Sequence, residues 1–129
     1  MTENRTHRYH RSDFGPLPAM LEHMDLFLTF GNDSVVVTNR LRVRAIQALS
    51  SLRLDARDLE ILSISSVGDQ SVPLDYNYLW ETNVLEIALP EPVSAGGVFS
   101  VETTTCCRPS DNILEGIYKD TTPAGCPQQ

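Results

Sequence analysis

The sequence has no uninterrupted apolar run that approaches the roughly 18 residues of a membrane-spanning helix, so we expect no such span. It also has no excess of positive charge, since its formal net charge is −7 at pH 7. Phosphate binding requires a basic surface, and this charge balance therefore disfavours nucleic acid as a partner. The polar N-terminal residues contain none of the apolar core of a secretion signal, which predicts a cytoplasmic protein.

Cysteine is scarce as well, with Cys106, Cys107 and Cys126 as the 3 examples. Adjacent cysteines rarely pair with each other, and an odd number cannot pair completely, so reduced thiols are the simplest interpretation. We expect one of the two adjacent side chains to lie in the core and the other at the surface. Nothing in the pattern marks a thiol of low pKa, and a cysteine–histidine nucleophile with His23 is not favoured.

The common catalytic motifs are missing. The sequence contains no H-E-x-x-H, no C-x-x-C, no G-x-S-x-G and no glycine-rich phosphate loop. His7 and His10 form an H-x-x-H pair without the further ligands that a metal site needs. Glu115 would need a second acid nearby for general acid–base chemistry, and we interpret it as a hydrogen-bonded structural residue. We therefore predict no catalytic, metal-binding or cofactor-binding residue in this chain.

Alternating side chains are what the sequence does have, most clearly from Ser34 to Ala45. One side of this stretch is largely apolar and the other carries Arg40, Arg42 and Arg44. Because side chains alternate between faces along a strand, the stretch is predicted to be one long β-strand with an apolar face and a basic face. We interpret the basic face as solvated and balanced by nearby acids. A specific anion site is the alternative.

The same alternation predicts strands on either side. His23 to Phe30 should pair with the long strand in a hairpin, because Gly31, Asn32 and Asp33 tolerate the positive φ of a tight turn. Ile46 to Leu54 also fits a helical turn, but we favour a loop followed by a strand. The remaining predicted strands or strand pieces are Leu52–Leu54, Leu59–Val67, Val72–Leu74, Tyr76–Trp80, Val84–Leu89, Val98–Cys107 and Ile113–Tyr118.

Two of these segments have irregular features. Leu59–Val67 has a mixed phase, which indicates burial on both faces or a bulge. Pro90 and Pro92, with the glycines that follow, are predicted to lie in a loop. Several short strands without a convincing helix predict a single all-β domain, an antiparallel β-sandwich over residues 13–129. A flexible polar arm is predicted over residues 1–12.

Four segments resemble, in the same order, parts of the M1 family of zinc aminopeptidases. Asp111–Tyr118, D-N-I-L-E-G-I-Y, resembles the family's N-T-x-L-E-G-L-Y segment, and Tyr9–Phe30 resembles its tyrosine-rich arm and D-L-T-F strand. Leu52–Ile64 resembles its L-x-L-x-G-E-D-L-x-L-x-S-V pattern, and Val84–Pro92 resembles its L-x-I-x-x-L-P-E segment. The resemblance extends over nearly the whole chain, to about Cys126.

The resemblance implies an N-terminal β-sandwich domain that packs against a catalytic domain and helps to enclose its active site. In the family, the zinc ligands and the G-A-M-E-N motif lie in that next domain, and the parent would remove N-terminal residues from peptides. The family's substrate-binding glutamate has no counterpart before Gln129, so no catalytic or zinc-binding residue is carried onto this sequence. A domain cut from its parent would leave a sheet edge unpaired and open to self-association.

A stand-alone binding module is the second hypothesis, because a β-sandwich fold does not fix a function. Tyr76, Tyr78 and Trp80 could form an aromatic platform for a glycan, a peptide or a protein partner. The plainer interpretation is that these rings pack over the edge of the sandwich. A purely structural subunit is a third possibility.

Overall fold

The computed structural model describes residues 15–109 of the 129-residue chain, and this part contains strands and no helix. The strands are β1 (Ala19–Phe30), β2 (Val35–Ala45), β3 (Leu49–Asp55), β4 (Glu60–Ser66), β5 (Val72–Pro73), β6 (Tyr76–Leu79), β7 (Val84–Val93) and β8 (Val98–Cys107). Between residues 15 and 109 there is accordingly no helix suited to crossing a membrane. The predicted arm at 1–12 and the predicted strand Ile113–Tyr118 lie outside the described residues.

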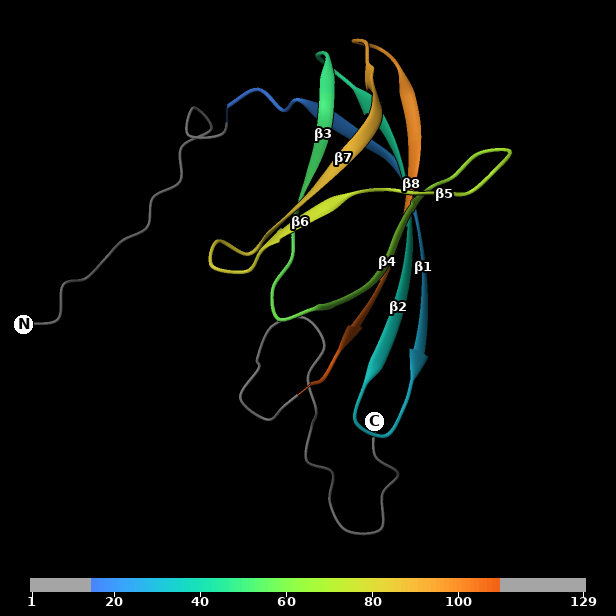
Figure 1. Cartoon of the computed structure of the whole chain (residues 1–129), viewed down its shortest axis with the longest axis vertical. Helices are drawn as coiled ribbons and strands as arrows, with labels where there is room; N and C mark the ends of the chain where they lie inside the picture. Colours follow the sequence, from blue (N-terminus) through green and yellow to red (C-terminus); the bar gives the residue numbers. More distant parts are fainter. Residues whose placement is uncertain (1–14, 110–129) are drawn as a thin grey trace, which may run out of the picture.

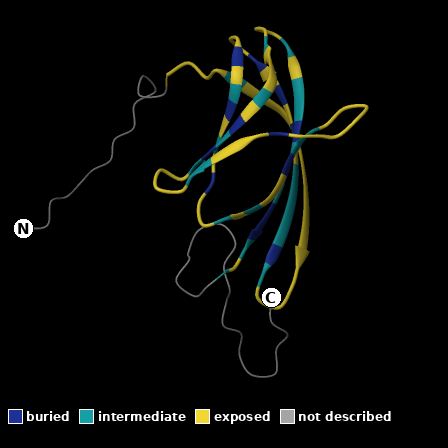
Figure 2. Cartoon of the chain, in the orientation of Figure 1, coloured by how far each residue is buried: buried dark blue, intermediate teal, exposed yellow. Residues whose placement is uncertain are grey.

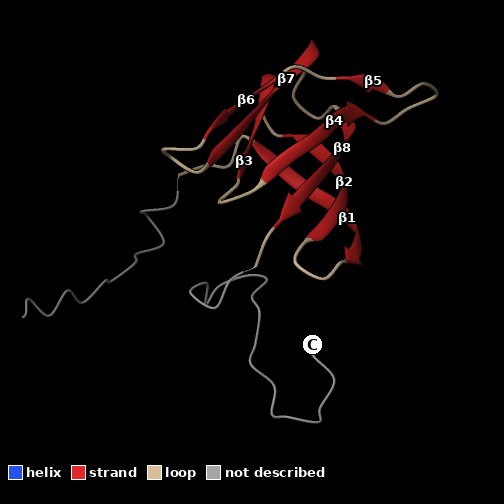
Figure 3. Ribbon diagram, turned by 60° about the horizontal axis from the view of Figure 1, so that its bottom comes forward, coloured by secondary structure: helices blue, strands red, loops and turns tan. Residues whose placement is uncertain are grey.

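The strands form two antiparallel sheets that face each other (Figures 1 and 3). The larger sheet has the order β1-β2-β8-β4-β5, and the smaller has the order β3-β7-β6. We call the side of the larger sheet that faces the smaller one its inner face. This arrangement confirms the prediction of an all-β antiparallel sandwich, whereas the domain limits at residues 13 and 129 stay a prediction.

The core lies between the two sheets and is built from both. Its most buried members include Ile87 of β7, which is 0% exposed, and Val101 of β8, which is 1% exposed. Burying one such side chain stabilises the fold by about 1.5–3 kcal/mol. The other buried residues of the cluster are Leu41, Val43, Leu52, Ala56, Ile64, Leu74 and Leu85. The apolar side of the long strand β2 therefore faces the core, as its alternation predicted.

The β1–β2 hairpin is confirmed, with Phe30 opposite Val35 and a turn closed by a 2.8 Å hydrogen bond from the Gly31 amide to the Ser34 carbonyl. Its turn differs from the predicted one. Within residues 15–109, positive φ occurs at Asp58, Asn83 and Gly96, and not at the hairpin turn. A turn of four residues reverses the chain here without a left-handed conformation.

Bulges account for the irregular phases in the sequence. β4 shifts register between Ile61 and Ser63, which exposes Leu62 and confirms the bulge predicted for this segment. β3 shifts between Leu49 and Ser51. The register is irregular here, since β7 runs from Ala88 to Val93 opposite this short stretch of β3. The irregularity lies between Leu49 and Leu52, which are both buried and are spaced as on a helix although they lie in a strand.

Two segments run beyond their predicted ends. β1 begins at Ala19 rather than at His23, because Ala19 and Met20 pair with the end of β2 before a bulge at Glu22. β7 continues to Val93 through Pro90 and Pro92, so the predicted loop is confined to residues 94–97 and was wrong at the prolines. The prolines are tolerated because the ladder with β3 is interrupted between Ala88 and Val93, where no backbone N–H is needed.

Candidate interaction surface

A row of exposed apolar side chains follows the inner face of β1. The register with β2 places these residues beside the inner-facing residues of that strand, as in the pairs Leu21–Val43 and Met24–Leu41. Val43 and Leu41 are each 3% exposed, whereas Leu21 is 48% and Met24 is 43% exposed. We call this row the β1 stripe; its members are Leu21, Met24, Leu26, Leu28 and Phe30.

The β1 stripe is exposed because of the sheet order. β1 is the outermost strand of the larger sheet, and the residues of this sheet that are buried in the core come from β2, β4 and β8. In Figure 2 β1 is exposed along its length, while its neighbours carry buried residues. Contiguous exposed apolar side chains of this kind mark interaction surfaces in soluble proteins. The stripe is therefore the strongest candidate for a contact surface among residues 15–109.

A polar group beside the stripe lacks a partner. The side-chain oxygen of Asn39 on β2 is buried without a hydrogen bond, between its cross-strand neighbours Leu26 and Thr103. Leaving a buried acceptor unpaired costs about 1–3 kcal/mol. A partner that covered the inner face here and supplied an N–H or O–H donor would remove that cost.

The arginines of β2 lie on the opposite, outer face, where they form ion pairs with glutamate side chains. Arg40 forms an ion pair with Glu102 on β8 at 2.5 Å. Glu22 bridges Arg44 at 2.5 Å and Arg42 at 3.4 Å, because the bulge in β1 sets its carboxylate between them. The solvated, charge-balanced face is thus confirmed, and the pairing of the three arginines gives no support to the alternative of an anion site.

The thiols and the described histidine do not meet. Among the described residues His23 is the one histidine, and its Nε2 lies 3.0 Å from Asp25 on the exposed outer face. The register places it level with Ser100 of β8, well before Cys106. Cys106 is buried and Cys107 is half-buried. This agrees with the expected split between core and surface, and it gives no support to a cysteine–histidine nucleophile.

The described residues offer no metal site. Within residues 15–109 no three histidine, cysteine, aspartate or glutamate side chains lie together as ligands. Zinc binding in proteins generally requires three or four such ligands, so this part of the chain does not fit a zinc ion. His7, His10, Glu115 and Cys126 lie outside the described residues.

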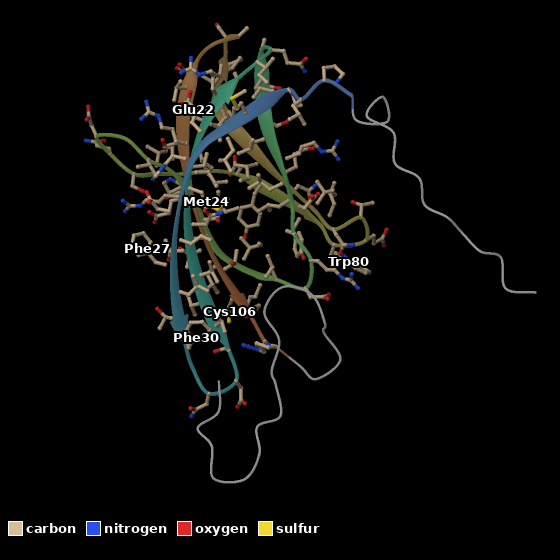
Figure 4. All side chains as sticks on the ribbon, turned by 180° about the vertical axis from the view of Figure 1, so that it is seen from behind. Glu22, Met24, Phe27, Phe30, Trp80 and Cys106 are labelled. Carbon is tan, nitrogen blue, oxygen red and sulfur yellow. The ribbon has the colours of Figure 1, made fainter. Side chains whose placement is uncertain are left out.

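The three aromatic residues have different environments. The Tyr78 hydroxyl donates to the Ala56 carbonyl at 3.1 Å and accepts from the Leu59 amide at 3.4 Å, so its ring is part of the core edge. Tyr76 is 44% exposed, and Trp80 is 70% exposed in the turn between β6 and β7 (Figure 4). The packing interpretation is correct for Tyr78 and wrong for Trp80, and the three rings do not form one platform.

Sequence comparisons identify no relative. The chain matches no protein-family model, and a search of curated proteins finds no match.

Comparison of the fold does identify similar structures. An M1 zinc metallopeptidase from Deinococcus radiodurans superposes with a TM-score of 0.62 and 21% identity, over 71% of this chain and 21% of that one. A variant of the same metallopeptidase bound to a Tyr-Ser-Ala substrate gives the same values. A two-domain M1 zinc metallopeptidase bound to L-arginine gives a TM-score of 0.63 over 78% of this chain and 22% of that one, again at 21% identity.

These similarities establish a shared fold. The chain spans about a fifth of the length of the structures it matches. The fold expected from the resemblance to the M1 family is therefore the fold that is present, and it corresponds to one region of much longer zinc metallopeptidases.

Proposed function

We propose that this chain is the non-catalytic N-terminal β-sandwich domain of an M1-type zinc aminopeptidase. The observation that carries the proposal is the match of its fold to about a fifth of several M1 zinc metallopeptidase chains. The ordered sequence motifs, from Tyr9–Phe30 to Asp111–Tyr118, support the same assignment independently of the fold. The role of the domain is to pack on a catalytic domain and to shape the cleft that peptides enter.

The β1 stripe supports the packing role. A sheet face with exposed apolar side chains and the unpaired Asn39 oxygen is suited to a protein partner that supplies apolar groups and a donor. Within the parent, that partner is the remainder of the same polypeptide. The outer face, with its paired arginines, remains in solvent.

The parent protein would remove N-terminal residues from peptides in the cytoplasm. Zinc, held in the parent's catalytic domain, would supply an activated water for peptide hydrolysis. Residues 15–109 contribute no group of ligands to it. The role of this chain would be to pack on the catalytic domain and to help enclose its active site. We therefore expect no turnover from the 129-residue chain alone.

The first experiment is to read the gene beyond the codon for Gln129. An open frame that encodes an H-E-x-x-H helix allows the longer protein to be produced beside the 129-residue chain. Hydrolysis of aminoacyl-p-nitroanilides should occur with the longer protein, should cease after removal of metal by a chelator, and should be absent for the short chain.

Two results would contradict the proposal. If the reading frame ends in a stop codon before any zinc-binding motif, the gene encodes no catalytic domain on which this chain could pack. Zinc-dependent turnover by the purified 129-residue chain would show that the chain itself is catalytic.

A stand-alone binding module is the second candidate, and the exposure of Trp80 is the observation that favours it. An exposed aromatic ring on a tight hairpin is suited to stacking against a sugar or contacting a peptide. Titration with glycans or peptides should then shift Trp80 fluorescence in a saturable manner, and a Trp80→Ala variant should not bind. Failure of diverse glycan and peptide panels to shift the emission would leave the domain role as the better account.

A further inference from the structure

β1 is an unusual edge strand. Within the described sheets it pairs with β2 alone, and its 12 residues include neither proline nor lysine. The opposite edge of the same sheet, β5, is 2 residues long and contains Pro73. Proteins generally protect sheet edges by shortness, proline, lysine or bulges, because an open edge pairs with other strands. β5 has such protection, and most of β1 does not.

The bulge at Glu22 confines the open part to the second half of β1. The register with β2 is interrupted between Leu21 and His23 and is regular from His23 to Phe30. A bulge twists a strand and breaks the run of edge hydrogen-bonding groups, so it hinders pairing on its N-terminal side. The regular stretch can still accept another strand.

The sequence of that stretch is complementary to itself. When two copies are laid antiparallel with Phe27 opposite Phe27 of the second copy, side chains of similar character face each other. On the inner side Leu26 meets Leu28 of the second copy, and Met24 meets its Phe30; on the outer side Asp25 meets its Thr29. We infer that two copies of this chain associate by antiparallel pairing of their β1 strands, centred on Phe27, into one continuous sheet.

Exposure and chemistry favour this register. Phe27 is 59% exposed on the outer face, where its neighbour on β2 is Thr38, and in Figure 4 it projects from the opposite side of β1 to Met24. In the paired state the two rings shield each other, and cross-strand aromatic pairs are favourable. Apolar residues of the β1 stripe from both copies then form one larger patch.

Registers centred closer to the bulge are worse. Centring the pair on Leu26 would set the Asp25 carboxylate against Phe27 of the second copy. Centring it on Asp25 would bring two carboxylates face to face in a chain whose net charge is already −7. Like charges directly opposite each other destabilise a strand pair. The Phe27 register avoids both conflicts.

This inference does not rest on the proposed enzyme-domain function, and its test is the solution mass of the 129-residue chain. Light scattering and sedimentation across the micromolar range should give a dimer in reversible equilibrium with monomer. Phe27→Lys and Phe27→Glu should each raise the dimer dissociation constant by about tenfold or more, because like charges would then meet at the centre. Mixing the two variants should restore a dimer, since lysine and glutamate face each other only in this register.

Leu62→Lys is the matched control. Leu62 is exposed to 49% on β4, away from β1, so its replacement should leave the dimer intact. Circular dichroism would verify that each variant keeps its strand content. A wild-type chain that remains monomeric throughout the range would overturn the inference. A mixture of the two Phe27 variants that stays monomeric while the wild type dimerises would also overturn it.

Discussion

At the scale of single residues, Tyr78 shows how one hydroxyl joins two segments of the chain. Its oxygen binds the Ala56 carbonyl and the Leu59 amide, and both groups lie in the connection between β3 and β4. Tyr78→Phe should lower the free energy of unfolding by about 1–3 kcal/mol, because it leaves partly buried backbone groups unpaired. Urea denaturation followed by circular dichroism measures this loss. Tyr76→Phe, at an exposed residue of the same strand, should change it by less than about 0.5 kcal/mol.

At the scale of elements, the turn between β7 and β8 depends on one glycine. Gly96 has a φ of +84°, and its amide donates to the Ala45 carbonyl at 2.7 Å, while the Ala45 amide donates to the Gly97 carbonyl. Gly96→Ala should cost about 1–2 kcal/mol, because a side chain disfavours this left-handed conformation. Gly68→Ala is the control, since both sites have open space and Gly68 has no such φ. Equal melting temperatures for the two variants would contradict this explanation.

The long strands could be predicted from the sequence and the bulges could not. Alternation gave Val98–Cys107 with the bounds of β8, and it gave β2 to within one residue. It missed the start of β1 because the bulge at Glu22 reverses the phase there. A bulge depends on the partner strand, which is distant in sequence, so local periodicity contains no information on its position.

The exposure of the β1 stripe could not be predicted from the sequence for a related reason. Leu26 and Leu41 belong to the same alternating pattern, which does not tell which of the two apolar faces is covered. One is 51% exposed and the other 3%, because the order of strands in the sheet decides which apolar face is covered. The ion pairs of Glu22 were not foreseen either, since they too depend on the bulge.

At the scale of the whole molecule, the β1 stripe makes a prediction about the longer protein. Leu26→Asp should lower its melting temperature and its peptidase activity, because a carboxylate would then be buried where the catalytic domain packs. Leu62→Asp is the control: the two leucines are similarly exposed, at 51% and 49%, but Leu62 lies on β4. If both substitutions lower the melting temperature equally, the β1 stripe is not the packing surface. In the 129-residue chain alone, neither should unfold the domain, because each side chain is already half in solvent.

The position of β2 between β1 and β8 has a consequence for how the chain acquires its structure. β1 is joined to β2 by a short turn, whereas β8 is remote in the sequence: the hydroxyls of Thr38 and Thr104, 3.5 Å apart, are separated by 66 positions. During synthesis the β1–β2 hairpin therefore emerges long before β8, the strand that pairs with the other edge of β2. Contacts between such distant segments slow folding, and unpaired apolar strands are prone to aggregate before their partner strand is available. We therefore expect the chain to be most prone to aggregate after the β1–β2 hairpin has emerged and before β8 has been synthesised.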